Sequence, residues 1–352
     1  MARKQEQESA RTEISEVGPN LLRMELPIRM PGLGHVNMYA LLDDEGAAVV
    51  DPGLPGPATW KAIRHRLKQA GLHPRHIHTV VVTHSHPDHF GGAARLAREA
   101  GAAVVAHADF RFGVLETSQA PEVSVEDLSA QEDDAGHRRV VQAWNHTTPW
   151  GGQHPRPGLR TRLKWRAARL MGRTFIPTVT RPVRQGDALR LAGREWFVTH
   201  TPGHTEDHIC LHCPEEGLFL AGDHVLPTIT PHISGLALAR DPLENFFDSL
   251  DRVGALPNVK LALPAHGHPF DDLLGRTQAI KQHHVERLEK VKQIGRELGP
   301  ASVQAFSQRL FQPRSWGGMA ESETYAHLEH LRLKGAAAAH RDAQGLLLYE
   351  TG

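Results

Sequence analysis

Residues 80–92, with the sequence VVVTHSHPDHFGG, constrain the fold more than any other stretch of the chain. The run of three valines is typical of a buried strand, and three histidines and one aspartate follow it within six positions. A strand that empties into a glycine-containing loop presents such side chains at the edge of a sheet, where binding sites form. We therefore expect a sheet whose strand ends surround a functional site.

Three other stretches repeat this pattern of an apolar run followed by a polar residue and a turn. His204 stands in a Pro-Gly turn within THTPGHTEDH, Asp223 ends the run LFLAGD, and His266 follows LALPA. Strand ends of this kind are how an α/β scaffold brings distant residues around one cleft. The four stretches therefore predict a single shared site.

Hydrophobic periodicity predicts strands that alternate with helices. We expect strands at residues 21–27, 36–42, 47–51, 79–83, 102–107, 188–191, 195–199, 208–212 and 218–221. We expect helices at residues 58–70, 93–100 and 243–253. This alternation favours a layered α/β domain.

The residue types at the predicted strand ends are metal ligands. The set of histidines and carboxylates consists of His84, His86, Asp88, His89, His204, Asp223 and His266. A structural zinc ion takes four ligands and is closed, whereas catalytic sites use histidine and carboxylate and leave room for water. Seven ligands divide into two sites that share a bridging aspartate, and two cations can hold a hydroxide nucleophile at neutral pH. We expect two Zn²⁺ ions per chain, although carboxylate and imidazole ligands also suit manganese or iron.

The ordered motifs THSHPDH, PGH, GD and PAHGH resemble those of the metallo-β-lactamase superfamily, over residues 21 to about 272. The resemblance implies a four-layer αββα sandwich. It assigns His84, His86 and His204 to the first metal, Asp88, His89 and His266 to the second, and Asp223 to the bridge. It also gives Asp88 the catalytic role of orienting the hydroxide.

Two departures from the family patterns bear on function. Residue 223 is an aspartate rather than the cysteine of true β-lactamases, and this resembles the glyoxalase-II and ribonuclease side of the superfamily. Asp51 matches the family's supporting aspartate beside the metals, but Pro52 replaces the usual threonine. Antibiotic hydrolysis is therefore not the expected main activity.

The chain after residue 272 has a different pattern. A long helical stretch leads into two further helical segments and a terminal hairpin. The motifs TPGHTEDH, KQHHVERLEKV after PAHGH, and YAHLEHLRLKG before the hairpin resemble those of lactamase-B-like proteins with a C-terminal winged helix. We expect residues 1–272 to form the catalytic domain and residues 273–352 a winged-helix-like domain. Packing on the core or a homodimer interface is the expected use of this second domain.

Residues 135–186 interrupt the α/β pattern with eleven basic residues and no acidic one. One interpretation is a solvated lid whose arginines cover its apolar side. The other is a cationic collar that attracts an anionic substrate. Its candidate substrate-binding residues are Arg160, Arg162, Lys164 and Arg166.

Three histidines close to the expected ligands are further candidates for substrate contact. His208 follows His204 by four residues, His224 is next to Asp223, and His232 lies in LPTITPHISG. His208 could equally begin the next strand. His224 and His232 are expected to line the substrate entrance.

Composition limits the partners and the compartment. Lysine plus arginine and aspartate plus glutamate number 40 each, so net charge gives no overall attraction to nucleic acid or membrane. Cys210 and Cys213 lie in a strand-like stretch in which they should point to opposite faces, so a metal or redox pair is not expected. Without a signal-peptide pattern or a membrane-spanning run, we expect a soluble, cytoplasmic protein.

Three functions follow from these observations. The leading hypothesis is a binuclear zinc hydrolase acting on an ester, thioester or lactone of a small-molecule substrate, in which a metal-bridging hydroxide attacks the carbonyl. The second is a phosphodiesterase or endoribonuclease for single-stranded RNA that uses the basic residues 135–186. The third is a nucleic-acid or partner-binding protein acting through the C-terminal domain, although the glutamates in residues 322–335 match a phosphate backbone poorly.

Overall fold

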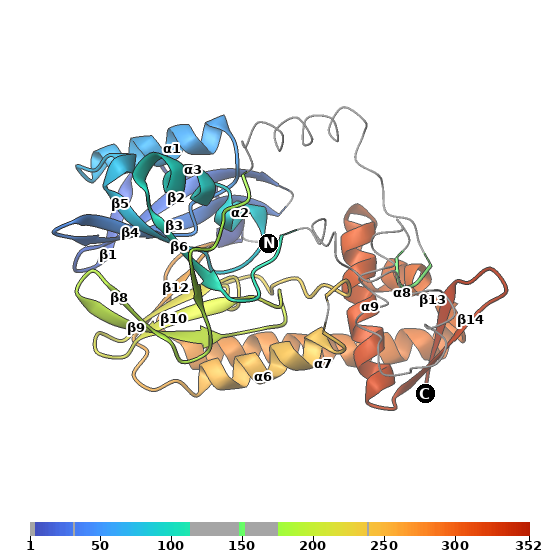
Figure 1. Cartoon of the computed structure of the whole chain (residues 1–352). Coiled ribbons are helices and arrows are strands. Elements are labelled where there is room, and N and C mark those ends of the chain that lie inside the picture. Colours follow the sequence, from blue (N-terminus) through green and yellow to red (C-terminus); the bar gives the residue numbers. More distant parts are fainter. Residues whose placement is uncertain (1–3, 31, 113–147, 152–174, 238) are drawn as a thin grey trace.

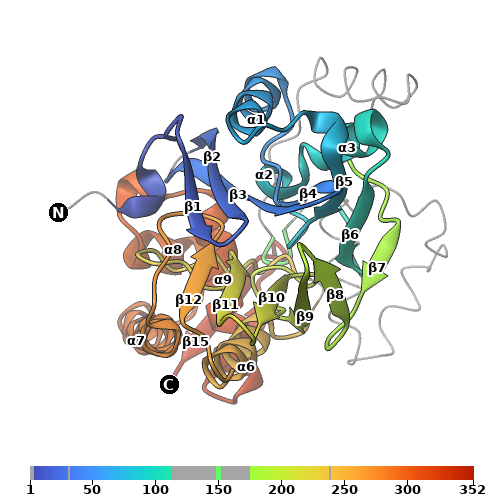
Figure 2. The ribbon, with the colours of Figure 1, turned by 90° about the vertical axis from the view of Figure 1, so that its left-hand side faces the viewer.

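Two β-sheets pack face to face, and helices cover both outer faces (Figure 2). The computed structural model of the chain describes residues 4–30, 32–112, 148–151, 175–237 and 239–352. Helices α1 (Pro57–Gln69) and α3 (Ala93–Ala100) lie on the outer side of the first sheet (Figure 2). Helices α6 (Pro242–Gly254) and α7 (Leu273–Leu298) lie on the outer side of the second (Figure 2). The expected four-layer α/β sandwich is confirmed.

The first sheet has the strand order β1-β2-β3-β4-β5-β6-β7. Its strands are β1 (Ile14–Gly18), β2 (Leu21–Met30), β3 (Leu33–Asp43), β4 (Gly46–Val50), β5 (Ile77–Val81), β6 (Ala103–His107) and β7 (Arg181–Val183). The first four pair antiparallel, and β4 to β7 pair parallel. The parallel strands β4 to β6 are rich in valine and alanine because helices and the second sheet cover both of their faces.

The second sheet has the order β12-β11-β10-β9-β8. Its strands are β8 (Ala188–Leu191), β9 (Arg194–His200), β10 (Ile209–Cys213), β11 (Leu218–Gly222) and β12 (Leu261–Pro264). Only β11 and β12 pair in parallel. Cys210 packs in the core outside this sheet and Cys213 in the core between the sheets, as the strand period predicts.

The helices of the sandwich are α1 (Pro57–Gln69), α2 (Pro87–Phe90), α3 (Ala93–Ala100), α6 (Pro242–Gly254) and α7 (Leu273–Leu298). Short 3-10 turns lie at Gln5–Gln7, Pro74–His76 and Pro313–Ser315. Asp241 caps α6 by accepting the Glu244 backbone N–H at 3.0 Å, which satisfies a donor that the first helical turn would leave unpaired. None of the helices in the described part of the chain is both long and apolar enough to cross a membrane.

Three layers of buried side chains hold the sandwich together. Met24, Ile63 and Leu96 belong to the layer between the first sheet and its helices. Trp196 belongs to the layer between the sheets, and Phe246 to the layer between the second sheet and α6 and α7. Because every layer excludes water from large apolar side chains, the strand ends are rigidly placed.

The C-terminal part is built on the far end of α7 (Figure 1). It contains β13 (Ala301–Ser302), α8 (Val303–Leu310), α9 (Gly318–Leu333), β14 (Ala337–Arg341) and β15 (Leu347–Thr351). The three strands form one small sheet in the order β13-β15-β14. Phe306 and Tyr325 of this part share a continuous core with Phe246 of the sandwich. The domain boundary at residue 272 and the winged-helix assignment stay predictions.

Candidate metal centre

Four strand ends deliver the seven expected ligand residues to one place. The loop after β5 and the short helix α2 carry His84, His86, Asp88 and His89, and the segments after β9, β11 and β12 carry His204, Asp223 and His266. The turn before His204 requires Gly203, which has φ +136° and whose added Cβ would lie 2.5 Å from Phe246 Cβ. The packing of this turn on α6 therefore fixes the position of His204.

The first group of ligands consists of three histidines with facing ring nitrogens. His84 Nε2 lies 3.0 Å from His86 Nδ1, and His204 Nε2 lies 3.1 Å from the same Nδ1 atom. The three nitrogens converge closely enough to hold one metal ion. This arrangement agrees with the first expected ligand set.

The second group combines one carboxylate with two histidines. Asp88 Oδ2 lies 3.6 Å from His89 Nε2 and 3.6 Å from His266 Nε2. These three side chains are buried, with His89 and His266 fully shielded from solvent. They form the second convergent set of ligand atoms.

Asp223 lies between the two groups. Its Oδ2 atom is 3.5 Å from His89 Nε2 and 3.6 Å from His204 Nε2, while its Oδ1 atom is 3.3 Å from His266 Nε2. A single carboxylate therefore reaches histidines of both groups, as the bridging prediction requires.

Several buried polar atoms at this place have no hydrogen-bond partner. They are His89 Nε2, His266 Nε2 and Asp223 Oδ1. A buried polar atom without a partner costs about 1–3 kcal/mol, and these atoms all point into the same cluster. Histidine and carboxylate atoms left open in this way fit bound transition-metal ions.

The other ring nitrogens of the histidines are occupied by acceptors of the protein. His204 Nδ1 donates to the His232 carbonyl at 2.7 Å, and His266 Nδ1 donates to the His35 carbonyl at 2.6 Å. Because a carbonyl only accepts, the proton of each ring is fixed at Nδ1. Nε2 then presents its lone pair to the cluster, which is the form a metal ligand needs.

Asp51 performs the same task for His89. Its Oδ2 atom accepts from His89 Nδ1 at 2.9 Å and from Thr83 Oγ1 at 2.7 Å, while Oδ1 accepts the Thr83 backbone N–H at 2.9 Å. Thr83 Oγ1 in turn lies 3.0 Å from His84 Nδ1 and accepts from it. Asp51 thus orients one histidine of each group, and Pro52 leaves these bonds intact.

Burial and neighbouring charges shift the pKa values of the ligand histidines in opposite directions. Burial lowers the pKa of His84 well below its usual range and lowers that of His86 to about 3. Burial also opposes charge on His89, but Asp223, Asp88 and Asp51 outweigh it and raise its pKa. The pKa of Asp223 is lowered because the histidines around it outweigh the effect of its burial. Without metal, the proton on His89 compensates the carboxylates, and a bound cation would replace it.

Two of the three histidines considered for substrate contact lie deeper than the sequence suggests. His208 and His224 are fully buried. His208 Nε2 accepts the Asp223 backbone N–H at 3.0 Å, so it supports the central carboxylate from behind. His224 packs edge-on against Phe246 with ring centroids 5.1 Å apart. Neither side chain reaches an entrance, because both are shielded from solvent.

His232 is half-buried, with its side chain directed to Glu323 and its carbonyl to His204. The four basic candidates Arg160, Arg162, Lys164 and Arg166 lie outside the described residues.

Sequence reasoning missed two supporting carboxylates. Asp207 is buried, and its Oδ1 accepts from Ser85 Oγ at 2.9 Å, which ties together the loops that carry His84 and His204. Burial raises the pKa of Asp207 to about 6. Glu323 comes from α9 and reaches His232 from more than 90 residues away in the sequence. Of these two carboxylates, only Asp207 could have been singled out in the sequence, because it lies in the same motif, THTPGHTEDH, as the ligand His204.

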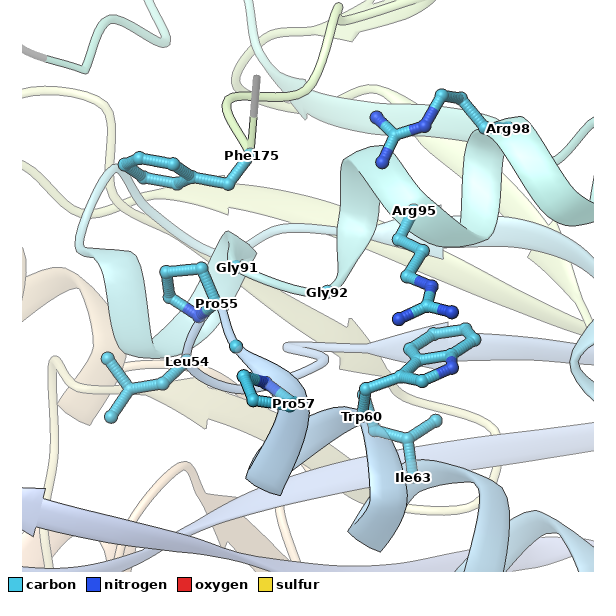
Figure 3. A pocket seen from close by; sticks show the side chains of 11 residues that line it. Leu54, Pro55, Pro57, Trp60, Ile63, Gly91, Gly92, Arg95, Arg98 and Phe175 are labelled. Carbon is cyan, nitrogen blue, oxygen red and sulfur yellow. The ribbon is translucent and has the colours of Figure 1, made fainter. Parts of the chain in front are cut away.

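A cavity of about 300 Å³ lies between α1 and α3, and Gly91 and Gly92, which connect α2 with α3, also line it (Figure 3). Its lining is mainly apolar, and the Arg95 guanidinium stacks 4.1 Å above the Trp60 ring at one edge. None of the seven ligand residues lines it. This cavity is therefore separate from the cluster of candidate ligands.

Comparison with known sequences gives the family. The model of the family described as the Metallo-beta-lactamase superfamily matches residues 31–266. A probable metallo-hydrolase of Bacillus subtilis is 23% identical over 336 residues, which cover 90% of this chain and 94% of that protein. A hydroxyacylglutathione hydrolase of Maricaulis maris is 32% identical over 143 residues, or 40% of this chain and 53% of that protein.

A lactamase-like protein of Penicillium aethiopicum is 33% identical over 111 residues, or 32% of this chain. The match spans 34% of the length of that protein, so this chain covers about a third of the curated relatives of this kind.

Two solved structures have a similar fold over nearly the whole chain. A metallo-beta-lactamase family protein from Thermus thermophilus has a TM-score of 0.71 and 28% identity, covering 96% of this chain and 100% of that chain. A beta-lactamase domain protein from Burkholderia ambifaria also has a TM-score of 0.71, with 25% identity and coverage of 97% and 95%. With its two convergent ligand groups and its matched sequence and fold, the chain belongs to the metallo-beta-lactamase superfamily.

Proposed function

We propose that the chain is a binuclear zinc hydrolase that cleaves an ester, thioester or lactone. The observation that carries the proposal is the position of Asp223, whose carboxylate reaches histidines of both ligand groups at 3.3 to 3.6 Å. One ion would be held by His84, His86 and His204 and the other by Asp88, His89 and His266. When bound, the ions would supply positive charge that polarises a carbonyl and lowers the pKa of water from about 15.7 toward about 7.

The side chains of the site have separate tasks in this reaction. Asp88 is ionised, because His89 and His266 outweigh its burial and lower its pKa. Its carboxylate can therefore accept a hydrogen bond from the attacking water and orient it toward the carbonyl carbon. The water oxygen then bonds to that carbon, the bond to the leaving oxygen or sulfur breaks, and the leaving group takes up a proton.

The surroundings of the site keep its geometry fixed. Three ligand histidines donate their Nδ1 protons to fixed acceptors, which hold the rings in place. The acceptors are the carbonyls of His232 and His35 and the carboxylate of Asp51. Such outer contacts commonly change metal affinity or activity by about 10–100-fold when they are removed. The reacting groups are therefore organised before substrate arrives, which lowers the reorganisation that the reaction requires.

Two observations support a carboxylic ester, thioester or lactone as the substrate. The bridging position holds an aspartate, as in the glyoxalase-II pattern, and one relative carries the name hydroxyacylglutathione hydrolase. That relative shares 40% of this chain, so its activity is a guide to the bond that is cleaved and not to the whole substrate.

A second candidate is phosphodiester cleavage of single-stranded RNA at the same metals. The eleven basic residues and absent acidic residues of 135–186 favour it, since such a segment can neutralise phosphates.

A substrate panel separates these functions. The zinc-loaded chain should be assayed against acyl thioesters, lactones, phosphodiesters and single-stranded RNA, with Asp88→Ala as the matched inactive variant. The first proposal would be supported if the wild-type chain hydrolyses a thioester or lactone and Asp88→Ala does not. Cleavage of RNA alone would replace it with the second, and no zinc uptake would refute both.

A further inference from the structure

The segment after β11 connects the metal centre with the C-terminal part. It runs from Asp223 to the start of α6 and contains His232, whose carbonyl accepts the proton of His204 Nδ1 at 2.7 Å. The position of this carbonyl decides how the His204 ring is turned. Whatever holds residues 232–235 in place therefore also orients a ligand of the first metal.

Helix α9 holds this segment at several points. The Gly235 backbone N–H donates to Ser322 Oγ at 3.0 Å and lies 3.2 Å from the Ser322 carbonyl oxygen. An added Cβ at Gly235 would lie 2.5 Å from that oxygen and 2.6 Å from the Tyr325 ring, so the two backbones are in direct contact. Between these contacts, Ile233 is fully buried in the core that Tyr325 shares.

Glu323 contacts the side chain of His232, the residue whose carbonyl accepts from His204. Its carboxylate accepts from His232 Nδ1 at 3.3 Å, and its other oxygen is paired with the Arg287 guanidinium of α7. The Glu323 side chain is only 12% exposed. Burial by itself would raise the pKa of Glu323, but the His232 hydrogen bond and the Arg287 charge outweigh it and lower the pKa to about 2. Glu323 is therefore a fixed anion at neutral pH.

We propose that Glu323 is a positioning residue for the first metal site: it holds His232, and the His232 carbonyl orients His204. This inference rests on the proposed function, since it concerns the affinity of one of the two ions. It gives the C-terminal part a task in the metal centre, because α9 supplies Glu323, while Arg287, the partner of Glu323, comes from α7 of the sandwich.

The test compares variants of the full-length chain by zinc binding. Competition with a chromophoric chelator yields a dissociation constant for each of the two ions. Glu323→Ala should weaken one ion by about 10- to 100-fold and leave the other within about twofold, because only one ligand group depends on His232. Glu323→Gln retains an acceptor for His232 and should show a smaller loss.

The matched control is Glu329→Gln. Glu329 is a buried carboxylate of the same helix, but it holds Arg332 at 2.9 and 3.0 Å and the Tyr349 hydroxyl, away from residues 232–235. This variant should lower the melting temperature and leave both zinc constants unchanged. A general loosening of α9 would instead weaken zinc in both variants.

His232→Ala keeps the backbone carbonyl and removes only the side chain that Glu323 holds, so it tests the inference even if Glu323→Ala does not fold. It should weaken the same ion, and combining it with Glu323→Ala should add little, because both changes break one contact. Unchanged zinc constants in His232→Ala or in folded Glu323→Ala, or additive losses in the double variant, would overturn the inference. A wild-type chain that takes up no zinc would refute the proposed function itself.

Discussion

Replacing Asp51 by asparagine isolates the contribution of the outer contacts to metal binding. Asp51 has φ 54°, a left-handed conformation that asparagine tolerates better than alanine. The change therefore removes the charge and one acceptor without adding backbone strain. Three donors converge on this carboxylate, namely the backbone and hydroxyl of Thr83 and Nδ1 of His89.

The size of the effect follows from those three donors. An amide has one oxygen, so in either orientation its NH₂ group faces at least one buried donor. That costs about 1–3 kcal/mol of folding stability. If the NH₂ group faces His89, the ring proton moves to Nε2, the atom that the metal needs. Zinc affinity of one site should fall about 10–100-fold, which equals about 1.4–2.7 kcal/mol.

The assay is chelator competition together with thermal unfolding monitored by circular dichroism. Asp43→Asn is the matched control, because Asp43 also pairs with a histidine, His78, at 3.1 Å, but at the partly exposed surface. It should change stability by less than about 0.5 kcal/mol and zinc affinity not at all. If Asp51→Asn keeps both zinc constants within twofold of the wild type, the role given to Asp51 is refuted.

Three further outcomes are expected. Asp88→Ala and His84→Ala should lose most hydrolytic activity and keep the wild-type far-ultraviolet spectrum, and near-normal turnover in either variant would show that its role is wrong. Neutralising four basic residues together should raise the KM for an anionic substrate and leave kcat unchanged, and the difference in KM should shrink as the salt concentration rises. An unchanged KM at low salt would favour a solvated lid. Those four residues are Arg160, Arg162, Lys164 and Arg166.

The third outcome concerns acid stability. Burial lowers the pKa of His284 to about 2 and that of His327 to about 4, so the unfolded chain binds more protons below its histidine pKa of about 6.5. Stability should therefore fall as the pH drops from about 6.5 toward 4, as urea unfolding can measure, and His284→Leu should reduce the fall. An equal fall in that variant would contradict the assignment.

Most of the sandwich could be predicted because its strands are apolar and its helices amphipathic. The expected strand at 188–191 and the expected helix at 93–100 have the observed bounds, and α7 begins one residue after the predicted boundary. Strands β1 and β7 were not foreseen. Both are edge strands of the first sheet, and one is polar while the other has only three residues including a proline. Edge strands of this kind carry little hydrophobic signal.

The convergence of the seven candidate ligands could be predicted because each residue follows an apolar, strand-like run. The residues that surround them could not be predicted. His208 and His224 stand beside ligands in the sequence, but burial depends on how the second sheet meets α6, and that packing is absent from any short window. Glu323 lies on a helix whose sequence has no motif in common with the site. Its contact with His232 exists only because α9 packs against residues 232–235.

Anomalous diffraction at the zinc edge from crystals of the fully loaded chain tests the shared-aspartate site most directly. The account predicts two zinc peaks, one among His84, His86 and His204 and one among Asp88, His89 and His266, with the Asp223 carboxylate between them. A single peak that persists after exhaustive loading, or two peaks without Asp223 between them, would contradict the binuclear site.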